Sequence, residues 1–212
     1  MSSDGNLDTE SVGRPKAFLG RISSEVRSAA ARICQESAGQ RILDVGCGNG
    51  LLFAEIGDIH CTFFGMDADA QLLGEARQIL YDNKVGPAIF ALGDACHLPY
   101  RDESFDKALL LNTLINIPTD DLVTEFLHEL IRITRSGEKI IVDIRNNANW
   151  ILRTRYWLHN QRADFKTRGY ALGRLRDLFT ARGCEIRATH SIGPWLPFGP
   201  CGIVIEAEKR VD

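Results

Sequence analysis

The chain has 212 residues, of which 44% are hydrophobic and 25% charged, the composition of an ordinary globular protein. A chain of this length is most simply one domain with a sizeable core. Its formal net charge of −3 gives no overall positive field that would favour nucleic acid. The polar, acidic start and the shortness of every apolar run predict neither a signal peptide nor a transmembrane segment.

Cysteines are scattered along the chain, with no CxxC pair and no His/Cys cluster at the spacing of metal ligands. This usage predicts reduced thiols, no bound metal ion and a cytoplasmic protein. The six cysteines are Cys34, Cys47, Cys61, Cys96, Cys184 and Cys201.

Helical and strand periodicities alternate along the chain. Residues 1–14 are small and polar and are predicted to be a disordered tail, followed by one domain over residues 15–212. An amphipathic helix precedes the first strand. Later helices begin at the capping residues Asp69 and Thr119, and another is closed by Gly183. The expected strands are 41–45, 61–66, 88–92, 105–111, 139–144, 184–190 and 202–208, and the last helix is expected at 170–182.

This alternation predicts an α/β fold, a doubly wound, Rossmann-like, seven-stranded sheet. The last two strands are joined only by the loop at 191–200, which is too short for an ordinary parallel crossover. We therefore expect a mostly parallel sheet with an antiparallel last strand.

The most informative stretch is LDVGCGNG at residues 43–50, which runs a buried strand into three alternating glycines. Such glycines let the backbone turn sharply and bring a ligand against main-chain N–H groups. A dinucleotide-binding GxGxxG motif would need another glycine at position 51, where Leu51 stands. The stretch therefore predicts a nucleotide-like ligand but disfavours an NAD-dependent oxidoreductase.

Asp44 lies two residues before the first glycine, and the stretch resembles motif I of the class I S-adenosylmethionine-dependent methyltransferases. The resemblance covers residues 41–144, with Asp67 at the end of strand two and Asp94 after strand three. It implies that Asp44 contacts the methionine portion of S-adenosyl-L-methionine, that Asp67 accepts the ribose hydroxyls, and that Asp94 and the next N–H address the adenine. S-adenosyl-L-homocysteine would be the product. The cofactor-binding residues that it implies are Asp44, Gly46, Cys47, Gly48, Gly50, Asp67, Ala68, Asp94, Ala95 and Asn112.

Residues 145–168 hold six Lys/Arg against one acid in an otherwise acidic chain. The resemblance places this segment over the substrate side, so we predict a lid insertion that grips a small anionic acceptor. A competing interpretation is a short helix with solvated arginines and a buried face. A third is an aromatic and basic patch for a membrane surface or RNA. The competing buried face would hold Trp150, Thr154, Trp157 and Leu158; the substrate-binding candidates are Arg145, Trp150, Arg153, Arg155 and Tyr156.

Proximity and orientation supply up to roughly 7–11 kcal/mol in methyl transfer, so a catalytic base is not always needed. The candidates for a catalytic group are His159, Tyr156 and Asn112. The Pro-Pro-aromatic block that follows this Asn in N-methyltransferases of bases is missing, so a nucleic-acid acceptor is not expected. The sequence predicts O- or N-methylation of a small molecule. The alternatives are an RNA or protein methyltransferase and a non-catalytic S-adenosylmethionine-binding scaffold; the oligomeric state stays open.

Overall fold

The computed structural model describes residues 18–35, 39–57, 60–86, 88–162, 166–193 and 199–211; the predicted tail at 1–14 lies outside them. The strands of the described residues are β1 (Arg41–Val45), β2 (Thr62–Asp67), β3 (Ala88–Leu92), β4 (Phe105–Leu110), β5 (Thr134–Arg145), β6 (Cys184–Ile192) and β7 (Gly202–Lys209). The helices are α1 (Phe18–Cys34), α2 (Leu51–Ile56), α3 (Ala70–Asp82), α4 (Asp120–Ile133), α5 (Trp150–Asn160) and α6 (Leu172–Thr180), with a 3₁₀ turn at Leu114–Asn116.

The described strands form one sheet in the order β3-β2-β1-β4-β5-β7-β6. Strands β1 to β5 pair in parallel, whereas β7 pairs antiparallel with both β5 and β6. The predicted mostly parallel sheet with an antiparallel last strand is confirmed. Because the order reverses between β1 and β4, the carboxyl ends of these two strands border the crevice in which such sheets bind ligands.

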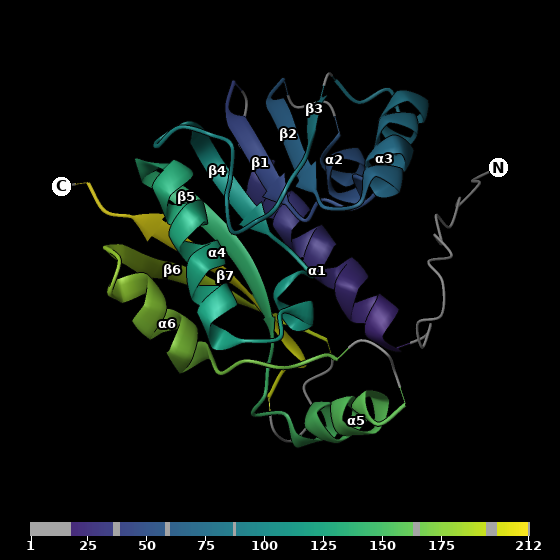
Figure 1. Ribbon diagram of the computed structural model, residues 1–212, viewed down its shortest axis with the longest axis vertical. Coiled ribbons are helices and arrows are strands. Elements are labelled where there is room, and N and C mark those ends of the chain that lie inside the picture. The colour runs from purple at the N-terminus through teal and green to yellow at the C-terminus, as the bar shows by residue number, and fades with distance from the viewer. Residues whose placement is uncertain are drawn as a thin grey trace.

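Helices cover both faces of the sheet, as Figure 1 shows. Helices α4 and α6 pack on one face, where residues such as Leu127 and Phe179 are fully buried. Helices α1, α2 and α3 pack on the other, around residues such as Val26 and Phe53. The two cores explain why β4 is buried along its whole length, as a strand covered on both faces of a sheet is.

The helix starts follow the capping chemistry of the sequence. Asp69 accepts hydrogen bonds from the backbone N–H groups of the first turn of α3. Thr119 accepts one from Leu122 in the same way at α4. Both predicted caps are confirmed.

Several elements end within two residues of their predicted bounds, and two elements begin more than one residue from their predicted starts. Strand β5 begins at Thr134 rather than at 139, because Thr134 pairs with Phe105 and a register shift separates that pair from the rest of the ladder. The last helix begins at Leu172 rather than at 170, because Tyr170 forms a parallel bridge with Asn146. This bridge joins the end of β5 to the segment that returns from α5.

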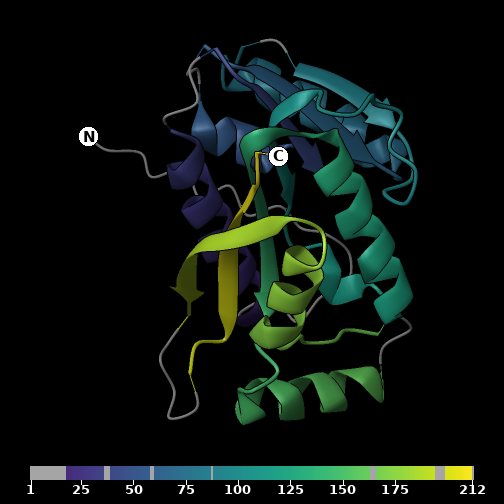
Figure 2. The ribbon, with the colours of Figure 1, turned by 90° about the vertical axis from the view of Figure 1, so that its left-hand side faces the viewer.

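Helix α5 lies apart from both helical layers (Figure 1). In Figure 2, β5 and β7 run vertically and α5 lies across the bottom of the molecule. Its buried side chains are Leu152 and Tyr156, which join the core on the α1 face. The interpretation that Trp150, Thr154, Trp157 and Leu158 form a buried face is wrong, because all four are exposed.

None of the described helices combines the length and the apolar character needed to cross a membrane.

Candidate functional site

The glycine loop leaves the carboxyl end of β1 and is tied to β2. The N–H groups of Gly46 and Cys47 both donate to the carbonyl oxygen of Met66, at 2.7 and 3.1 Å. Gly46, Gly48 and Gly50 have φ angles of 74°, 53° and 73°, all in the left-handed region that glycine adopts without strain. The alternation of glycines in the sequence therefore reflects the backbone conformation.

The loop glycines differ in what surrounds them. A Cβ at Gly46 would lie 2.4 Å from Oγ1 of Thr113, and one at Gly50 would lie 3.0 Å from Cβ of Ala76. These two positions are glycine because the protein packs against them. A Cβ at Gly48 would meet nothing within 4 Å. Open space at the middle of the loop is what a closely approaching ligand requires.

Asp67, at the end of β2, holds the middle of this loop. Its Oδ2 accepts the N–H of Gly48 at 2.7 Å, and its Oδ1 accepts the N–H of Asp69 at 3.0 Å. An ionised carboxylate offers about four acceptor sites, so each oxygen can accept a further bond. Asp67 can therefore hold the loop and a pair of ligand hydroxyls together.

Asp44 is an ionisable residue that is buried without a full set of hydrogen-bond partners. It is 4% exposed, and its Oδ1 has no hydrogen-bond partner among the described residues. Burial, and then the negative charge of Asp67, raise the pKa of Asp44 well above its usual range. A buried unpaired acceptor costs about 1–3 kcal/mol. A cationic or hydrogen-donating ligand group at this place would remove that cost.

Cys47 is not a candidate nucleophile. It is buried, and burial together with the negative charges of Asp44 and Asp67 raises the pKa of its thiol. A thiol in such a position stays protonated and unreactive at neutral pH. Its side chain lies against Gly65, where a Cβ would come within 2.8 Å of its sulfur.

The residues predicted for the adenine lie at the same edge of the sheet. The N–H of Gly93 donates to the carbonyl oxygen of Asp67 at 3.0 Å, which joins the ends of β3 and β2. Asp94 and Ala68 are exposed, and Ala95 is half-buried. Oδ1 of Asp94 accepts the N–H of Cys96 at 2.9 Å, which orders the loop after β3. The structure thus brings the predicted cofactor residues together along the ends of β1, β2 and β3.

Asn112, just after β4, has a φ of 55°, in the left-handed region that asparagine tolerates better than most side chains. Its N–H donates to the carboxylate of Asp143, and its Oδ1 accepts from Nη2 of Arg145 at 2.7 Å. The sequence analysis did not identify Asp143 or Ser23 as candidate site residues. The only available signal for Asp143 was an acid inside the apolar strand IIVDIR.

Arg145 is placed in β5 and not in a lid. It is 2% exposed and forms an ion pair with the carboxylate of Asp143. Its Nη2 also donates to Oγ of Ser23 on α1, at 3.1 Å. Its terminal nitrogens are therefore engaged by the protein, so the predicted role of Arg145 as a substrate-gripping cation is not favoured by this arrangement.

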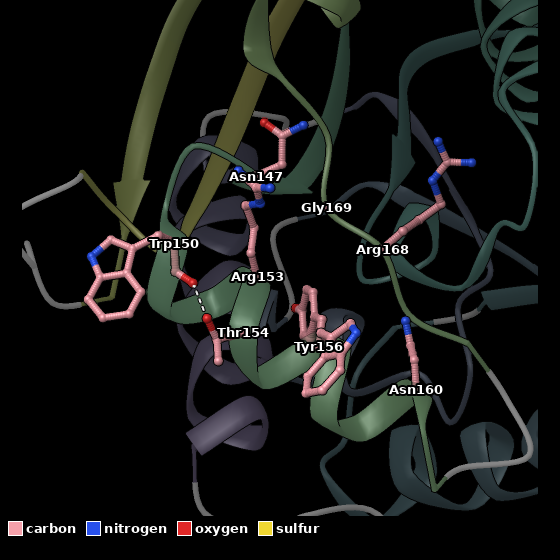
Figure 3. A pocket seen from close by; sticks show the side chains of 9 residues that line it. Asn147, Trp150, Arg153, Thr154, Tyr156, Asn160, Arg168 and Gly169 are labelled. Carbon is pink, nitrogen blue, oxygen red and sulfur yellow. Dashed lines mark hydrogen bonds between the residues drawn. The ribbon is translucent and has the colours of Figure 1, made fainter.

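A cavity of about 660 Å³ lies between α5 and residues 168–169 (Figure 3). Trp150, Arg153, Tyr156 and Trp157 contribute to its wall, and no acidic residue does. Arg155, also on α5, does not line it. We call this cavity the α5 groove.

The two arginines of the α5 groove differ in their partners. Arg168 is paired with Asp120 at 2.6 Å and donates to the carbonyl oxygen of Pro118 at 3.0 Å. The guanidinium of Arg153 makes no hydrogen bond or ion pair within the described part of the chain. Arg153 is therefore the cation of the groove that is available to a ligand.

Tyr156 lies between the groove and the cluster around Arg145. The residue is 5% exposed, and its hydroxyl has no well-formed hydrogen bond within the described residues. Burial raises the pKa of Tyr156, and the neighbouring charge of Arg145 offsets only part of this rise. The hydroxyl is therefore a neutral donor and not a base. His159 is half-buried near the end of α5 and is not part of the groove wall.

Comparison with known proteins gives a consistent result. The family described as "Methyltransferase domain" matches residues 43–142. Methyltransferase GfsG of Streptomyces halstedii is 33% identical over 108 residues, which are 50% of this chain and 38% of that protein. Ajmaline N-methyltransferase of Rauvolfia serpentina is 30% identical over 142 residues, covering 63% of this chain and 46% of that one.

Among solved structures, magnesium protoporphyrin IX methyltransferase from Synechocystis PCC 6803 with bound SAH is similar, with a TM-score of 0.73. Its identity is 16%, and the match covers 94% of this chain and 90% of that one. This likeness concerns the fold alone. The chain spans less than half the length of the first curated relatives that it matches.

Proposed function

Because the chain belongs to the class I S-adenosylmethionine-dependent methyltransferase family, we propose that it transfers a methyl group from S-adenosylmethionine to a small molecule. The observation that carries the proposal is the open space at Gly48, whose N–H is held by Asp67, together with the unpaired Oδ1 of the buried Asp44. The names of two relatives support a small acceptor, since one is an N-methyltransferase of ajmaline and another is a demethylmenaquinone methyltransferase.

The residues at this edge fit the cofactor group by group. The unpaired Oδ1 of Asp44 would accept from the ammonium of the methionine portion. The remaining lone pairs of Asp67 would accept the two ribose hydroxyls. Asp94 and the N–H of Ala95 would address the adenine edge. When bound, the cofactor supplies the electrophilic methyl group.

The chain's own contribution to the reaction is then mainly orientation. The groups near the groove are poor bases, because burial raises the pKa of Tyr156 and the guanidinium of Arg145 is ion-paired with Asp143. Holding the acceptor in line with the methyl group supplies up to roughly 7–11 kcal/mol without a base. Hydrogen bonds to Asp143 and Arg145 hold Asn112 in place. Asn112 would therefore be a rigid contact that orients the cofactor and the acceptor relative to each other.

For the acceptor, we propose a small anionic molecule held in the α5 groove. The groove volume of about 660 Å³ falls in the range of small-molecule sites. Its wall combines aromatic side chains with the free guanidinium of Arg153. An arginine can form two parallel hydrogen bonds with a carboxylate or phosphate, and its planar head stacks on aromatic rings.

We expect the Asp67→Ala change to weaken S-adenosylhomocysteine binding by roughly 10- to 150-fold. The reason is that charge-assisted bonds to the ribose hydroxyls are worth about 1.5–3 kcal/mol. Calorimetric titration measures the loss. Asp82→Ala, at the far end of α3, removes an exposed carboxylate that bonds Gln78 and is the matched control. Equal affinities of the wild type and the Asp67 variant would remove Asp67 from the proposed site.

The acceptor proposal is tested with Arg153→Gln, using Arg155→Gln as the matched control on the same helix. We expect the Arg153 change to lower turnover of anionic acceptors at least 10-fold, because a desolvated charged pair is worth a few kcal/mol. The Arg155 change should matter less than threefold, because Arg155 does not line the groove. S-adenosylhomocysteine affinity should stay unchanged in both. Equal losses for charged and uncharged acceptors would indicate damage to the fold and refute selection for charge.

A further inference from the structure

Helix α5 presents an apolar surface to solvent. Trp150 is 51% exposed, Trp157 61% and Leu158 50%. Tryptophan in a single-domain protein is more often well buried, so two such residues on one short exposed helix require an explanation. Trp150 and Trp157 also contribute to the wall of the α5 groove, but Leu158 does not line it and its exposure has no explanation there.

The exposed residues are arranged around one face of the helix. At 3.6 residues per turn, Trp150, Thr154, Trp157 and Leu158 occupy adjacent positions, opposite the buried Leu152. On the same helical wheel Arg153 falls on one side of this face and Arg155 on the other. An apolar, tryptophan-bearing centre flanked by arginines is the pattern of helices that lie in a membrane interface.

The charge of the segment is complementary to an anionic surface. Between Asp143 and Asp164 the sequence contains no acidic residue, while the chain as a whole has a net charge of −3. Helix α5 itself carries Arg153 and Arg155, and Arg162 follows it closely. Positive charge is therefore concentrated where the apolar side chains are exposed, on the helix that lies across the bottom of the molecule in Figure 2.

We propose that this face of α5 docks on the surface of an anionic lipid bilayer. Trp150 and Trp157 would lie at the level of the headgroups, where the amphipathic indole ring is most stable. Leu158 would enter the acyl boundary, and Arg153 and Arg155 would extend toward lipid phosphates. Docking needs neither cofactor nor acceptor, but Trp150, Arg153 and Trp157 belong both to this face and to the groove wall, so its test uses residues outside the groove.

The test is co-sedimentation of the full chain with lipid vesicles. We expect binding to phosphatidylcholine vesicles containing roughly one-third phosphatidylglycerol, and little binding to phosphatidylcholine alone. Raising the salt concentration should release the protein, because screening weakens the attraction to surface charges. In a Trp195→Phe background the two remaining tryptophans are both on α5, and their emission should shift to the blue on binding.

Variants outside the groove separate docking from acceptor binding. Leu158→Ser should lower partitioning several-fold, and Arg155→Gln about fivefold, the value of one basic residue near an anionic membrane. The matched controls are Tyr81→Ser, an aromatic residue that is 81% exposed on α3, and the pair Arg174→Gln and Arg176→Gln on α6. These controls should bind vesicles within about twofold of the wild type.

Three outcomes would overturn the proposal. One is the absence of vesicle binding, or equal binding to neutral and anionic vesicles. Another is equal loss in the control and α5 variants, which would mean that binding is not through this face. The last is a concentration-dependent dimer, or retention on RNA, that Leu158→Ser abolishes while vesicle binding persists. Unchanged S-adenosylhomocysteine affinity in each variant verifies that the cofactor region is still folded.

Discussion

The Gly48→Val variant should fold and yet show no measurable binding of S-adenosylhomocysteine by calorimetry. The φ of Gly48 is +53°, and its missing Cβ points into open space at the centre of the glycine loop. A branched side chain there would occupy the volume proposed for the cofactor. It would also stress the N–H that Asp67 accepts, because left-handed backbone at a non-glycine residue costs about 1–3 kcal/mol.

Gly183→Val is the matched control for this backbone strain. Gly183 has a φ of +73°, and its Cβ would likewise meet nothing within 4 Å, but it lies before β6 and away from the loop. Both variants should lose similar stability in chemical denaturation. Only the Gly48 variant should lose the ligand. Full affinity in a folded Gly48 variant would exclude the glycine loop as the cofactor site.

Most of the fold could be predicted from periodicity and capping. The helix starts at Asp69 and Thr119 were fixed locally, by side chains that accept the first N–H groups of the helix. The antiparallel last strand followed from the shortness of the preceding loop. The early start of β5 could not be predicted, because the polar residues after Thr134 join the sheet through pairing with a distant strand.

The candidate site was predictable where the backbone itself needs a residue type. Gly46 and Gly50 are required by positive φ angles and close neighbours, so a sequence pattern records them. The contact between Asp67 and Gly48 joins the end of β2 to the loop after β1, and the spacing of residues in the sequence does not reveal it.

The orientation of α5 was predicted wrongly in the interpretation that buried Trp150 and Trp157. Apolar character was taken there as a sign of burial. The packed side is instead set by Leu152 and Tyr156, which contact the α1 face of the core. The distribution of charge was more informative than apolar character. The excess of basic residues identified the segment 145–168, which contributes to the groove and contains the exposed face of α5.

Arg145→Leu is expected to lower the free energy of unfolding by about 3–5 kcal/mol at neutral pH. The side chains of Arg145 and Asp143 are 1% and 2% exposed, and the change would leave a buried carboxylate without its partner. Urea denaturation measures the loss. Arg187→Leu is the matched control, because Arg187 contacts two carboxylates at the surface and should be worth less than about 1 kcal/mol. Replacing Asp143 as well should restore much of the stability, since no charge would then be buried.

The pH dependence identifies the cause of that loss. Burial raises the pKa of Asp143 even with Arg145 beside it, and removing the guanidinium raises it further. A carboxyl whose pKa is higher in the folded state stabilises the fold below its unfolded pKa of about 3.9 and loses that contribution as the pH rises through the folded value. The stability difference between wild type and variant should therefore widen as the pH rises above the folded pKa of Asp143 in the wild type, and become constant above the higher folded pKa in the variant. A constant difference over that range would mean that the lost bonds to Asn112 and Ser23, and not the isolated carboxylate, cause the destabilisation.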